Sequence, residues 1–535
     1  MPPASRDVDI LIAGGGMAGC FAALGAALDA CSPDLSILLV EPSNVLGGQG
    51  TAGGVAGFCG DTQRVNTCFA RLVSQLAAHD LIDTYRANAD RRPFDLEWCG
   101  FFLQEMVVAA GVDVLLHTRV IDAAATDGTI DHVDVLCGSD AIRLSPTFVV
   151  DATGDCAIAV KAGFPTFHEP ANRQLPMSLY FTLWDTRQRV TPVLPVGCPT
   201  WEDDDDLPMT TLHRFDSGKI EVKMKVVGFD AASGESLSQA EIHARRQMLG
   251  LLYHLQTKGY AGQRLDTHVL ASVSRHIGQR EGRRLHGEYV LTEQDVTQGA
   301  VFADAVAVGT YHLDFHWPDR VQRAGTGITT MVEPYHIPLR SLIAKGSTNL
   351  LTAGRSLSGE QMAMSSYRVQ ATCAQTGFAA GCAARVAVQG DHSLRDLPVD
   401  KVQAALSDGG QSLDLADYGD YLRAHSLAHE FLFDAVPPAP SCHASSLVHL
   451  PNNRFLVTWF GGTREGHDDV GIWCAERDAT RWSAPRQVAK VRHLPHWNPV
   501  LFVAPNGDVH LFFRLVSRIR GLQVARVDRR VDGMK

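Results

Sequence analysis

The first 41 residues alternate short apolar runs with a stretch rich in alanine, leucine and glycine. Residues 9–13 form a short apolar run that is typical of a strand buried in a parallel sheet. Residues 20–30 are rich in alanine and leucine and predict a helix, and residues 35–41 predict a second strand. The pattern therefore predicts a strand–helix–strand unit and, with it, an α/β fold.

The start of this unit contains 19 consecutive uncharged residues, 10–28, which is long enough to suggest a membrane span. Three glycines interrupt the run, however. Asp7, Asp9 and Asp29 also flank it at positions where anchoring Lys or Arg residues would be expected. We therefore interpret the segment as strand, turn and helix, and we expect no membrane span.

Glycines 14, 16 and 19 stand between the predicted strand and helix with the spacing G-x-G-x-x-G. In this context Gly14 makes a tight turn, Gly16 lets the backbone approach a pyrophosphate, and Gly19 lets the helix pack against the strand. The N–H groups at the helix start would bind phosphate. Glu41 ends the second strand, 22 residues after Gly19, where a carboxylate can bind a ribose hydroxyl. The unit predicts a dinucleotide site for NAD or FAD, with a purely structural turn as the alternative.

A second glycine-rich segment, residues 45–54, follows Glu41, and a simple NAD domain does not need it. It resembles the segment of flavoprotein oxidoreductases in which paired glycines, here Gly47 and Gly48, lie along the dinucleotide. The same resemblance is carried by three later segments, residues 111–120, 148–155 and 349–355. Together they are similar to the FAD-dependent oxidoreductases of the glutathione-reductase-like superfamily, so the expected cofactor is FAD.

The resemblance implies a role for each later segment. The first forms a strand whose last residue, Val120, holds the adenine through its backbone. Asp155 lies in a tight turn beside the nucleotide, where the chain leaves the FAD domain, and Gly354 and Arg355 follow the strand that returns to it. Residues 362–388 then form one long helix, whose first N–H groups face the flavin pyrimidine and stabilise negative charge on the reduced ring.

Four arginines and two histidines fall within twelve residues, 275–286, of an otherwise acidic chain. They form either a solvated face with internal salt bridges, or a cationic pocket for the flavin or for a carboxylate or polyol substrate. The segment resembles a signature of one largely bacterial branch of the family, whose arginine positions are occupied by Arg280, Arg283 and Arg284. Arg280 and Arg284 are therefore candidate catalytic residues. The resemblance extends over residues 7–390.

The chain departs from the family pattern after residue 355. Glu360 and Gln361 stand where the family often has a Thr-His pair, whereas Arg368 matches and is expected at the cofactor. If that histidine is the acid/base of the family, this chain needs another. Glu360 is one candidate, although a carboxylate at a helix start is as readily a cap. His336 is a second candidate, because the family pattern around it would let it reach the active face of the flavin.

Two absences narrow the chemistry. No metal-ligand pattern stands out, so no metal is expected. Outside the second glycine segment no further G-x-G-x-x-G is visible, so a tightly held NADPH is not expected either. The substrate would then reduce the flavin. Oxygen, a quinone or a protein acceptor would reoxidise it, and the sequence does not identify which.

The last hundred residues have a different pattern, with short alternating strands after the proline cluster at 437–440. They resemble the start of a sialidase-like β-propeller built of BNR repeats, and Asp478 and Trp482 resemble a degenerate Asp box. This length makes about two blades, whereas a propeller needs four or more. We expect no glycosidase activity. The unclosed edges favour association with the FAD domain or another subunit, so a homo-oligomer stays open.

Composition and charge fit this picture. The net charge is −11, which argues against nucleic acid as a partner, and the 12 cysteines show no CxxC pair, which favours reduced thiols in the cytoplasm. The predicted α/β architecture is a discontinuous Rossmann-like FAD-binding domain (1–166 and 331–395) with an inserted α+β substrate domain (167–330). A helical linker (396–437), with helices at 399–406 and 418–433, leads to an all-β fragment (438–535).

The predicted function is transfer of a hydride from a small polar molecule, such as a sugar or hydroxy acid, to flavin N5. The alternative is a carbohydrate-binding or sialidase-derived module in which FAD is structural.

Overall fold

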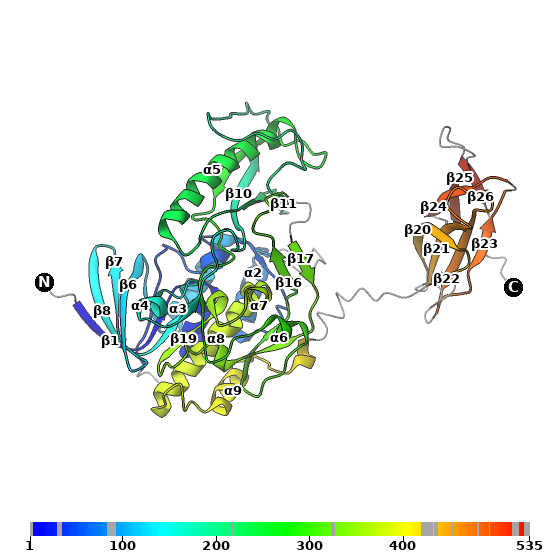
Figure 1. Cartoon of the computed structure of the whole chain (residues 1–535). Coiled ribbons are helices and arrows are strands. Elements are labelled where there is room, and N and C mark those ends of the chain that lie inside the picture. The colour runs from blue at the N-terminus through cyan, green and yellow to red at the C-terminus, as the bar shows by residue number, and fades with distance from the viewer. Residues whose placement is uncertain are drawn as a thin grey trace. The chain divides into compact units, whose positions relative to one another are not determined.

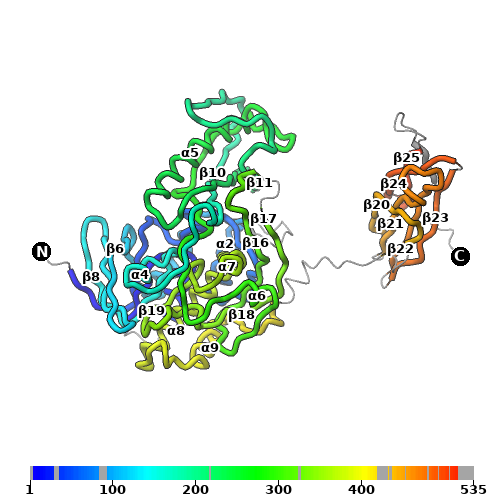
Figure 2. Tube along the Cα trace, in the orientation of Figure 1, coloured from blue at the N-terminus to red at the C-terminus, as the bar shows by residue number. Residues whose placement is uncertain are grey.

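The computed structural model describes residues 4–28, 35–82, 92–215, 218–322, 327–418, 432, 437–451, 454–478, 481–491, 493–504, 506–515 and 524–528. The chain divides into two compact units, Met1–Ser426 and Leu427–Lys535, and each is described here by itself (Figures 1 and 2). Most of the helix predicted over 418–433 lies outside the described residues.

The first unit is built on a sheet whose strand order is β5-β2-β1-β8-β7-β6, with β19 also paired to β8. Neighbouring strands from β5 to β8 run parallel, as do β8 and β19, whereas β6 and β7 form an antiparallel extension. The predicted strand–helix–strand unit and the α/β class are thus confirmed. The strands are β1 (Ala4–Ala13), β2 (Ile37–Val40), β5 (Asp113–Leu115), β6 (Thr118–Thr126), β7 (Thr129–Cys137), β8 (Asp140–Asp151) and β19 (Leu350–Thr352).

The single strand predicted over 111–120 is wrong. Strand β5 ends at Leu115, His117 has a left-handed backbone (φ 53°), and β6 begins at Thr118. The chain turns here because the His117 and Thr118 N–H groups donate to carbonyls of Ser43 and Glu41, just beyond the end of β2. Val120 therefore lies in β6, paired with Val135, and not at the end of a parallel strand.

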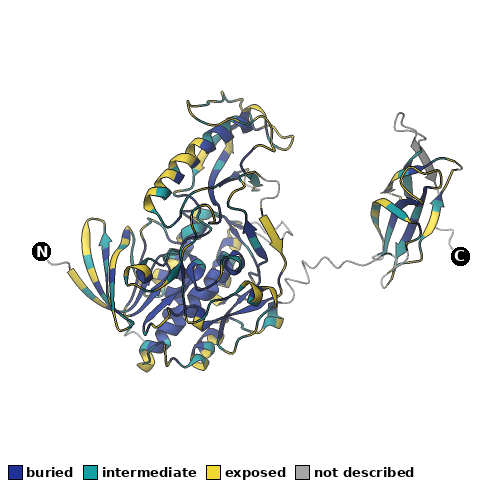
Figure 3. Cartoon of the chain, viewed as in Figure 1, coloured by how far each residue is buried: buried dark blue, intermediate teal, exposed yellow. Residues whose placement is uncertain are grey.

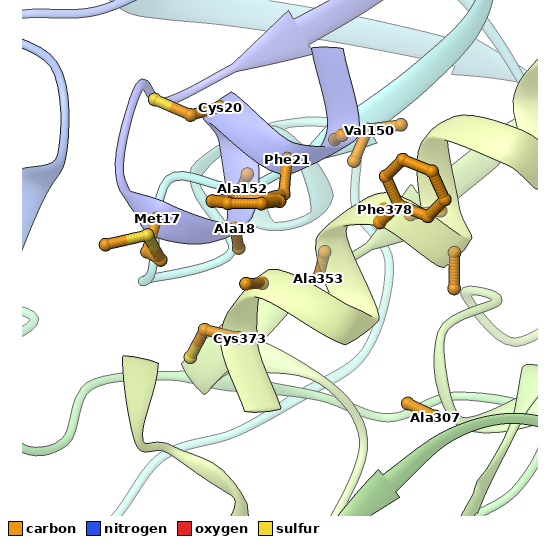
Figure 4. Packing of buried hydrophobic residues seen from close by; sticks show 14 of the residues in the cluster. Met17, Ala18, Cys20, Phe21, Val150, Ala152, Ala307, Ala353, Cys373 and Phe378 are labelled. Atoms are coloured by element: carbon orange, nitrogen blue, oxygen red, sulfur yellow. The ribbon is translucent and has the colours of Figure 1, made fainter. Parts of the chain in front are cut away.

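Helices α1 (Met17–Ala26) and α8 (Gln370–Gly390) pack closely against one another beside this sheet (Figure 4). A Cβ atom added to Gly377 would lie 2.0 Å from the carbonyl oxygen of Ala18, so only glycine fits at this crossing. The small residues of α8 are thus explained by helix packing. Figure 3 shows α8 buried along most of its length.

The one long helix predicted over 362–388 is wrong. The segment forms two helices, α7 (Gln361–Tyr367) and α8, separated by Arg368 and an extended Val369 (ψ 154°). The break lets the helix axis change direction, and it moves the N-terminal N–H groups of the long helix to Gln370. Neither Glu360 before α7 nor Val369 before α8 caps its own helix with a side chain.

A separate antiparallel sheet, in the order β11-β12-β10-β13, is covered by helix α5 (Gly234–Thr257) (Figure 1). Alternation along β12 sends Ile220, Val222, Met224 and Val226 into an apolar core with α5. The opposite face is polar. The strands are β10 (Met177–Asp185), β11 (Thr211–Arg214), β12 (Ile220–Val226) and β13 (His268–Val273).

Shorter elements complete the first unit. Its remaining helices are α2 (Thr67–Ala78), α3 (Leu96–Ala109), α4 (Ala157–Lys161), α6 (Glu293–Thr297) and α9 (Val399–Asp408), the last as predicted. Its remaining strands are β3 (Gly57–Phe58), β4 (Arg92–Pro93), β9 (Thr166–Phe167), β14 (Arg284–Leu285), β15 (Ala305–Gly309), β16 (Leu313–His316), β17 (Gly327–Thr330) and β18 (Tyr335–Pro338). Within the described parts of the chain, no helix is both long and apolar enough to cross a membrane.

The second unit is all-β, as predicted. Strands β20 to β23 form a four-stranded antiparallel sheet, and β24 to β26 form a three-stranded one. In the degenerate Asp box, Asp478 accepts a hydrogen bond from the Arg481 N–H at 2.9 Å, and Trp482 bridges to Arg477. The strands are β20 (Ser441–Leu450), β21 (Arg454–Gly462), β22 (Gly471–Arg477), β23 (Arg486–Ala489), β24 (His496–Val503), β25 (Val509–Leu515) and β26 (Val524–Asp528).

Candidate active site

The first glycine motif forms a crowded turn between β1 and α1. Gly14 has φ +98°, and a Cβ atom on Gly19 would lie 1.7 Å from the Gly14 carbonyl oxygen, so both positions require glycine. Gly16 is different, because an added Cβ would meet nothing nearer than Gly48 at 4.0 Å. No side chain caps α1 at Gly16. An uncapped helix start beside this open position fits a pyrophosphate.

Glu41 lies where β2 ends, next to that turn. Its carboxylate accepts hydrogen bonds from the backbone N–H groups of Gly15 (2.6 Å) and Ser43 (2.8 Å). Burial raises the pKa of Glu41, and these two hydrogen bonds oppose the rise. They also fix the direction of the carboxylate while leaving further lone pairs for ribose hydroxyls. Thr118 donates to the carbonyl of Glu41, so β6, which carries Val120, begins at the same corner.

The second glycine segment connects three parts of the unit. Gly47 and Gly48 have positive φ values of 102° and 56°, and Gly16 and Gly47 form a bridge. Gln370, the first residue of α8, donates from Nε2 to the carbonyl of Val55, just after this segment, at 2.8 Å, and a Cβ atom on Gly50 would lie 2.5 Å from its Oε1. The start of α8 therefore contacts this segment, as a flavin site between them requires.

The same segment also meets the polar face of the α5-covered sheet. A Cβ atom on Gly54 would lie 2.7 Å from Tyr180 Cβ and 3.0 Å from Ser274 Cβ. A cavity of about 220 Å³ opens there, with Thr51, Gly54, Tyr180, Glu221, Ser274 and Arg275 among its lining residues. The sheet thus forms a polar roof over the second glycine segment.

Asp155, Gly354 and Arg355 lie near the start of α1. The Asp155 carboxylate pairs with Arg283 Nη1 at 2.6 Å and accepts from the Arg283 N–H at 2.7 Å. Arg355 donates from Nε to the Gly154 carbonyl at 3.0 Å, and burial lowers its pKa. A Cβ on Gly354 would lie 2.7 Å from that of Ala18. Their predicted contacts with the cofactor stay predictions.

Arg280 and Arg368, both half-buried, belong to a charged cluster below the roof. Arg280 donates from Nη1 to the Pro176 carbonyl (2.7 Å) and to Ser178 Oγ (2.8 Å). Arg368 pairs through Nη2 with Asp314 Oδ2 at 3.0 Å. Burial lowers the pKa of Arg280, and the neighbouring charge of Arg368 adds to that effect. The charges of the two guanidinium groups therefore act on one another.

Arg284 is not part of this cluster, and its predicted catalytic role stays a prediction. Its side chain is 2% exposed and pairs with Glu281, which is fully buried, at 2.5 Å. It also donates to the Gly359 carbonyl at 3.0 Å and to Glu169 at 3.3 Å. Gln361 is tied to the same group, because its Nε2 donates to Glu281 Oε2 at 2.8 Å. Arg284 and Gln361 therefore both bind the buried carboxylate of Glu281.

His336 and Glu360 contact backbone groups, and their predicted roles stay predictions. His336 Nδ1 accepts from the Phe302 N–H at 3.1 Å and Nε2 donates to the Leu413 carbonyl at 2.8 Å, so both ring nitrogens are occupied by backbone. Glu360 accepts from the N–H of Glu293, the first residue of α6, at 2.8 Å. Glu360 therefore caps a helix, as the alternative interpretation predicted, but that helix is the neighbouring α6 and not α7.

Sequence reasoning missed four residues of the cluster and its roof: Tyr180, Lys225, Asp314 and His316. Lys225 is 1% exposed and lies opposite Ser178 in the sheet. Ser178 is the residue whose hydroxyl accepts from Arg280. The signal was present in the strict alternation Ile-Glu-Val-Lys-Met-Lys-Val at 220–226, which predicts one charged face. The local sequence does not show that another part of the fold buries this face.

Comparisons with known proteins agree with this geometry. A family model described as FAD dependent oxidoreductase matches residues 9–406, and one described as BNR repeat-like domain matches residues 453–532. A search of curated proteins found no match.

Similar solved structures include a geranylgeranyl bacteriochlorophyll reductase-like protein from Thermoplasma acidophilum. It has 12% identity and a TM-score of 0.40, and the match covers 79% of this chain and 89% of that chain. The p-nitrophenol 4-monooxygenase from Pseudomonas putida is also similar, with 10% identity, a TM-score of 0.38, and coverage of 79% and 93%. These scores are low, so the assignment rests on the family model, which matches well over half of the chain. The chain belongs to the FAD-dependent oxidoreductase family, and its cofactor is FAD.

Proposed function

We propose that the protein oxidises a small polar alcohol, preferentially a hydroxy acid, at the charged cluster of Arg280, Arg368, Lys225 and Asp314. One observation carries the proposal, namely the cluster of Arg280, Arg368 and Lys225 with Asp314 as its carboxylate, in which Lys225 is buried and the other three residues are half-buried. A site for an apolar substrate would not place three cationic groups in its interior, because burying unpaired charge is strongly unfavourable.

The donor groups of Arg280 support a carboxylate ligand. Its hydrogen bonds within the described part of the chain use Nη1 only, which leaves Nε and Nη2 for a bidentate partner. Arg368 likewise has a buried Nε without a partner among the described residues. A substrate carboxylate would satisfy these groups, whereas a neutral sugar would leave the excess positive charge in place.

FAD, when bound, supplies the oxidising power and accepts the hydride at N5. The residues of the chain do the rest. Arg280 and Arg368 hold the acidic end of the substrate, and the roof residues Ser178 and Tyr180 limit the access of water. With the acid fixed, the carbinol carbon of a 2-hydroxy acid is kept a short, constant distance from the guanidinium groups.

The test is anaerobic bleaching of the flavin by a panel of 2-hydroxy acids, matched neutral polyols and sugars. We expect bleaching by hydroxy acids, and Arg280→Met should raise KM about 10- to 100-fold through loss of a charge-assisted pair. Arg143→Gln is a matched control, because that arginine pairs with Asp134 on the antiparallel edge of the large sheet. Flavin that no member of the panel bleaches, together with glycan binding, would instead support the carbohydrate-binding alternative.

The electron acceptor and the compartment are part of the proposal. The eleven cysteines within the described residues are all free, which supports a reducing compartment such as the cytoplasm. Oxygen, quinones and protein acceptors are separated by the rate at which each reoxidises the bleached flavin.

A further inference from the structure

His316 has the arrangement of a general base, and none of the interactions described so far uses it. It lies on β16 two residues after Asp314, so both side chains project from the same face of the strand. His316 Nε2 is 3.2 Å from Asp314 Oδ1, and the side chain is only 9% exposed. Its other nitrogen, Nδ1, is buried without a hydrogen-bond partner among the described residues.

The partner of Nε2 decides where the ring proton sits. Burial opposes ionisation of Asp314, but the hydrogen bond to His316 and the charges of Arg368 and Arg280 outweigh it and hold the pKa of Asp314 well below its usual range. An ionised carboxylate can only accept, so Nε2 carries the proton of the neutral ring. The lone pair is then on Nδ1, the nitrogen without a partner.

The surroundings keep the ring neutral. Burial lowers the pKa of His316 to about 4, and the charge of Arg280 adds to the decrease, as does that of Arg368, while Asp314 opposes it. These are the charged groups that act on the ring from its own strand and from the elements packed against it. A substrate carboxylate bound to Arg280 would cancel part of this positive charge and make Nδ1 more basic when substrate is present.

A second histidine shows that pairing alone does not make a base. His254 on α5 also has Nε2 3.2 Å from a carboxylate, that of Asp204, and also has a buried Nδ1 without a partner in the described structure. It lines a pocket on α5 together with Lys258 and the acidic residues 202–205, however. What distinguishes His316 is its place beside Arg280 and Arg368.

We infer that His316 is the catalytic base of the oxidation, with Asp314 as its positioning residue. The inference rests on the proposed function. The substrate O–H bond breaks and its proton passes to His316 Nδ1. The adjacent C–H bond breaks with its electron pair, which FAD accepts, and the C=O bond forms. The substrate is oxidised by two electrons and the cofactor is reduced by two.

The experiment compares His316→Gln with the matched control His254→Gln, using the FAD-loaded full chain and the hydroxy acid that bleaches the wild-type flavin best. We expect kcat of His316→Gln to fall about 10²- to 10⁴-fold with unchanged FAD content, and His254→Gln to keep wild-type kcat. Asp314→Asn should also lower kcat, because an amide can donate to the ring and favour the other tautomer.

The pH profile gives a readout that a structural role would not move. In the wild type, kcat/KM should fall on the acid side near pH 4, and the acid limb of kcat should lie at higher pH because substrate is then bound. Added imidazole should rescue His316→Ala in part. A His316→Gln enzyme with kcat within threefold of wild type overturns the inference. If that variant loses FAD, a wild-type kcat that shows no acid limb overturns it instead.

The two failures are distinguishable. A wild-type flavin that no hydroxy acid or sugar reduces refutes the proposed function itself. A wild-type flavin that is reduced, at a rate that loss of His316 leaves unchanged, refutes only the base.

Discussion

The contact between α1 and α8 makes a quantitative prediction for Gly377→Ala. In most helices this change is favourable by about 1 kcal/mol, because alanine is the better helix former. Here the new Cβ would lie 2.0 Å from the carbonyl oxygen of Ala18. An unstrained carbon–oxygen contact is about 3.3 Å, so the helices must separate by roughly 1.3 Å.

The new Cβ is attached directly to the backbone and the Ala18 oxygen is part of it, so neither atom can rotate away from the other. Overpacking of this kind costs about 3 kcal/mol at the upper end of its usual range. Subtracting the gain in helix propensity leaves a net loss of about 2 kcal/mol in the free energy of unfolding. Ala18 also lies in the first turn of α1, so the same displacement should weaken FAD binding.

Thermal melting followed by the release of flavin fluorescence measures both effects. Gly377→Ala should melt several degrees below wild type and lose FAD at lower temperature. Gly234→Ala at the start of α5 is the matched control, because nothing lies within 4 Å of its Cβ position. A Gly377→Ala protein that melts at or above the wild-type temperature would refute the packing argument.

Two further predictions concern the buried charges. Arg284→Met should destabilise the first unit by about 3–5 kcal/mol, because it leaves the Glu281 carboxylate buried without its cation. The added change Glu281→Leu should recover part of the lost melting temperature. An Arg284→Met protein that melts at the wild-type temperature would contradict the importance of the buried pair. Burial lowers the pKa of Lys225 to about 8, with Arg280 adding to the effect, so its positive charge is present below pH 8 and lost above it. KM for an anionic substrate should therefore rise about tenfold between pH 7 and pH 9, and Lys225→Met, which has no charge to lose, should show a flat profile from an already raised KM.

The parts of the fold that were predictable depend on residues close together in sequence. The turn at Gly14 and Gly19 and the carboxylate of Glu41 belong to one unit of about 40 residues, and the structure shows strand, turn, helix and strand in the expected order. The break after α7 was not predictable in the same way. Nothing in residues 362–388 is a strong helix breaker, and the break accompanies the pairing of Arg368 with Asp314, 54 residues away.

The arginine-rich segment shows that prediction from the sequence has the same limit at the candidate site. Arg280 and Arg284 are four residues apart and match the same family signature, yet one lies below the roof and the other pairs with Glu281 in the interior. The sequence could not separate them, because the difference depends on where β10 and α7 pack. His316 could not be singled out either, because Asp314 lies two residues before it but the two arginines come together with it only in the fold.

The α1–α8 contact also has a consequence for biosynthesis. All ten residues of α1 are buried, and its partner helix begins about 350 residues later in the chain. At 5–20 residues per second, a ribosome needs about 20–70 s to make that interval. Throughout this time the nascent chain exposes an uncharged apolar run of 19 residues, 10–28. The helix whose start fits a pyrophosphate is therefore also the segment that stays without its packing partner until α8 is made.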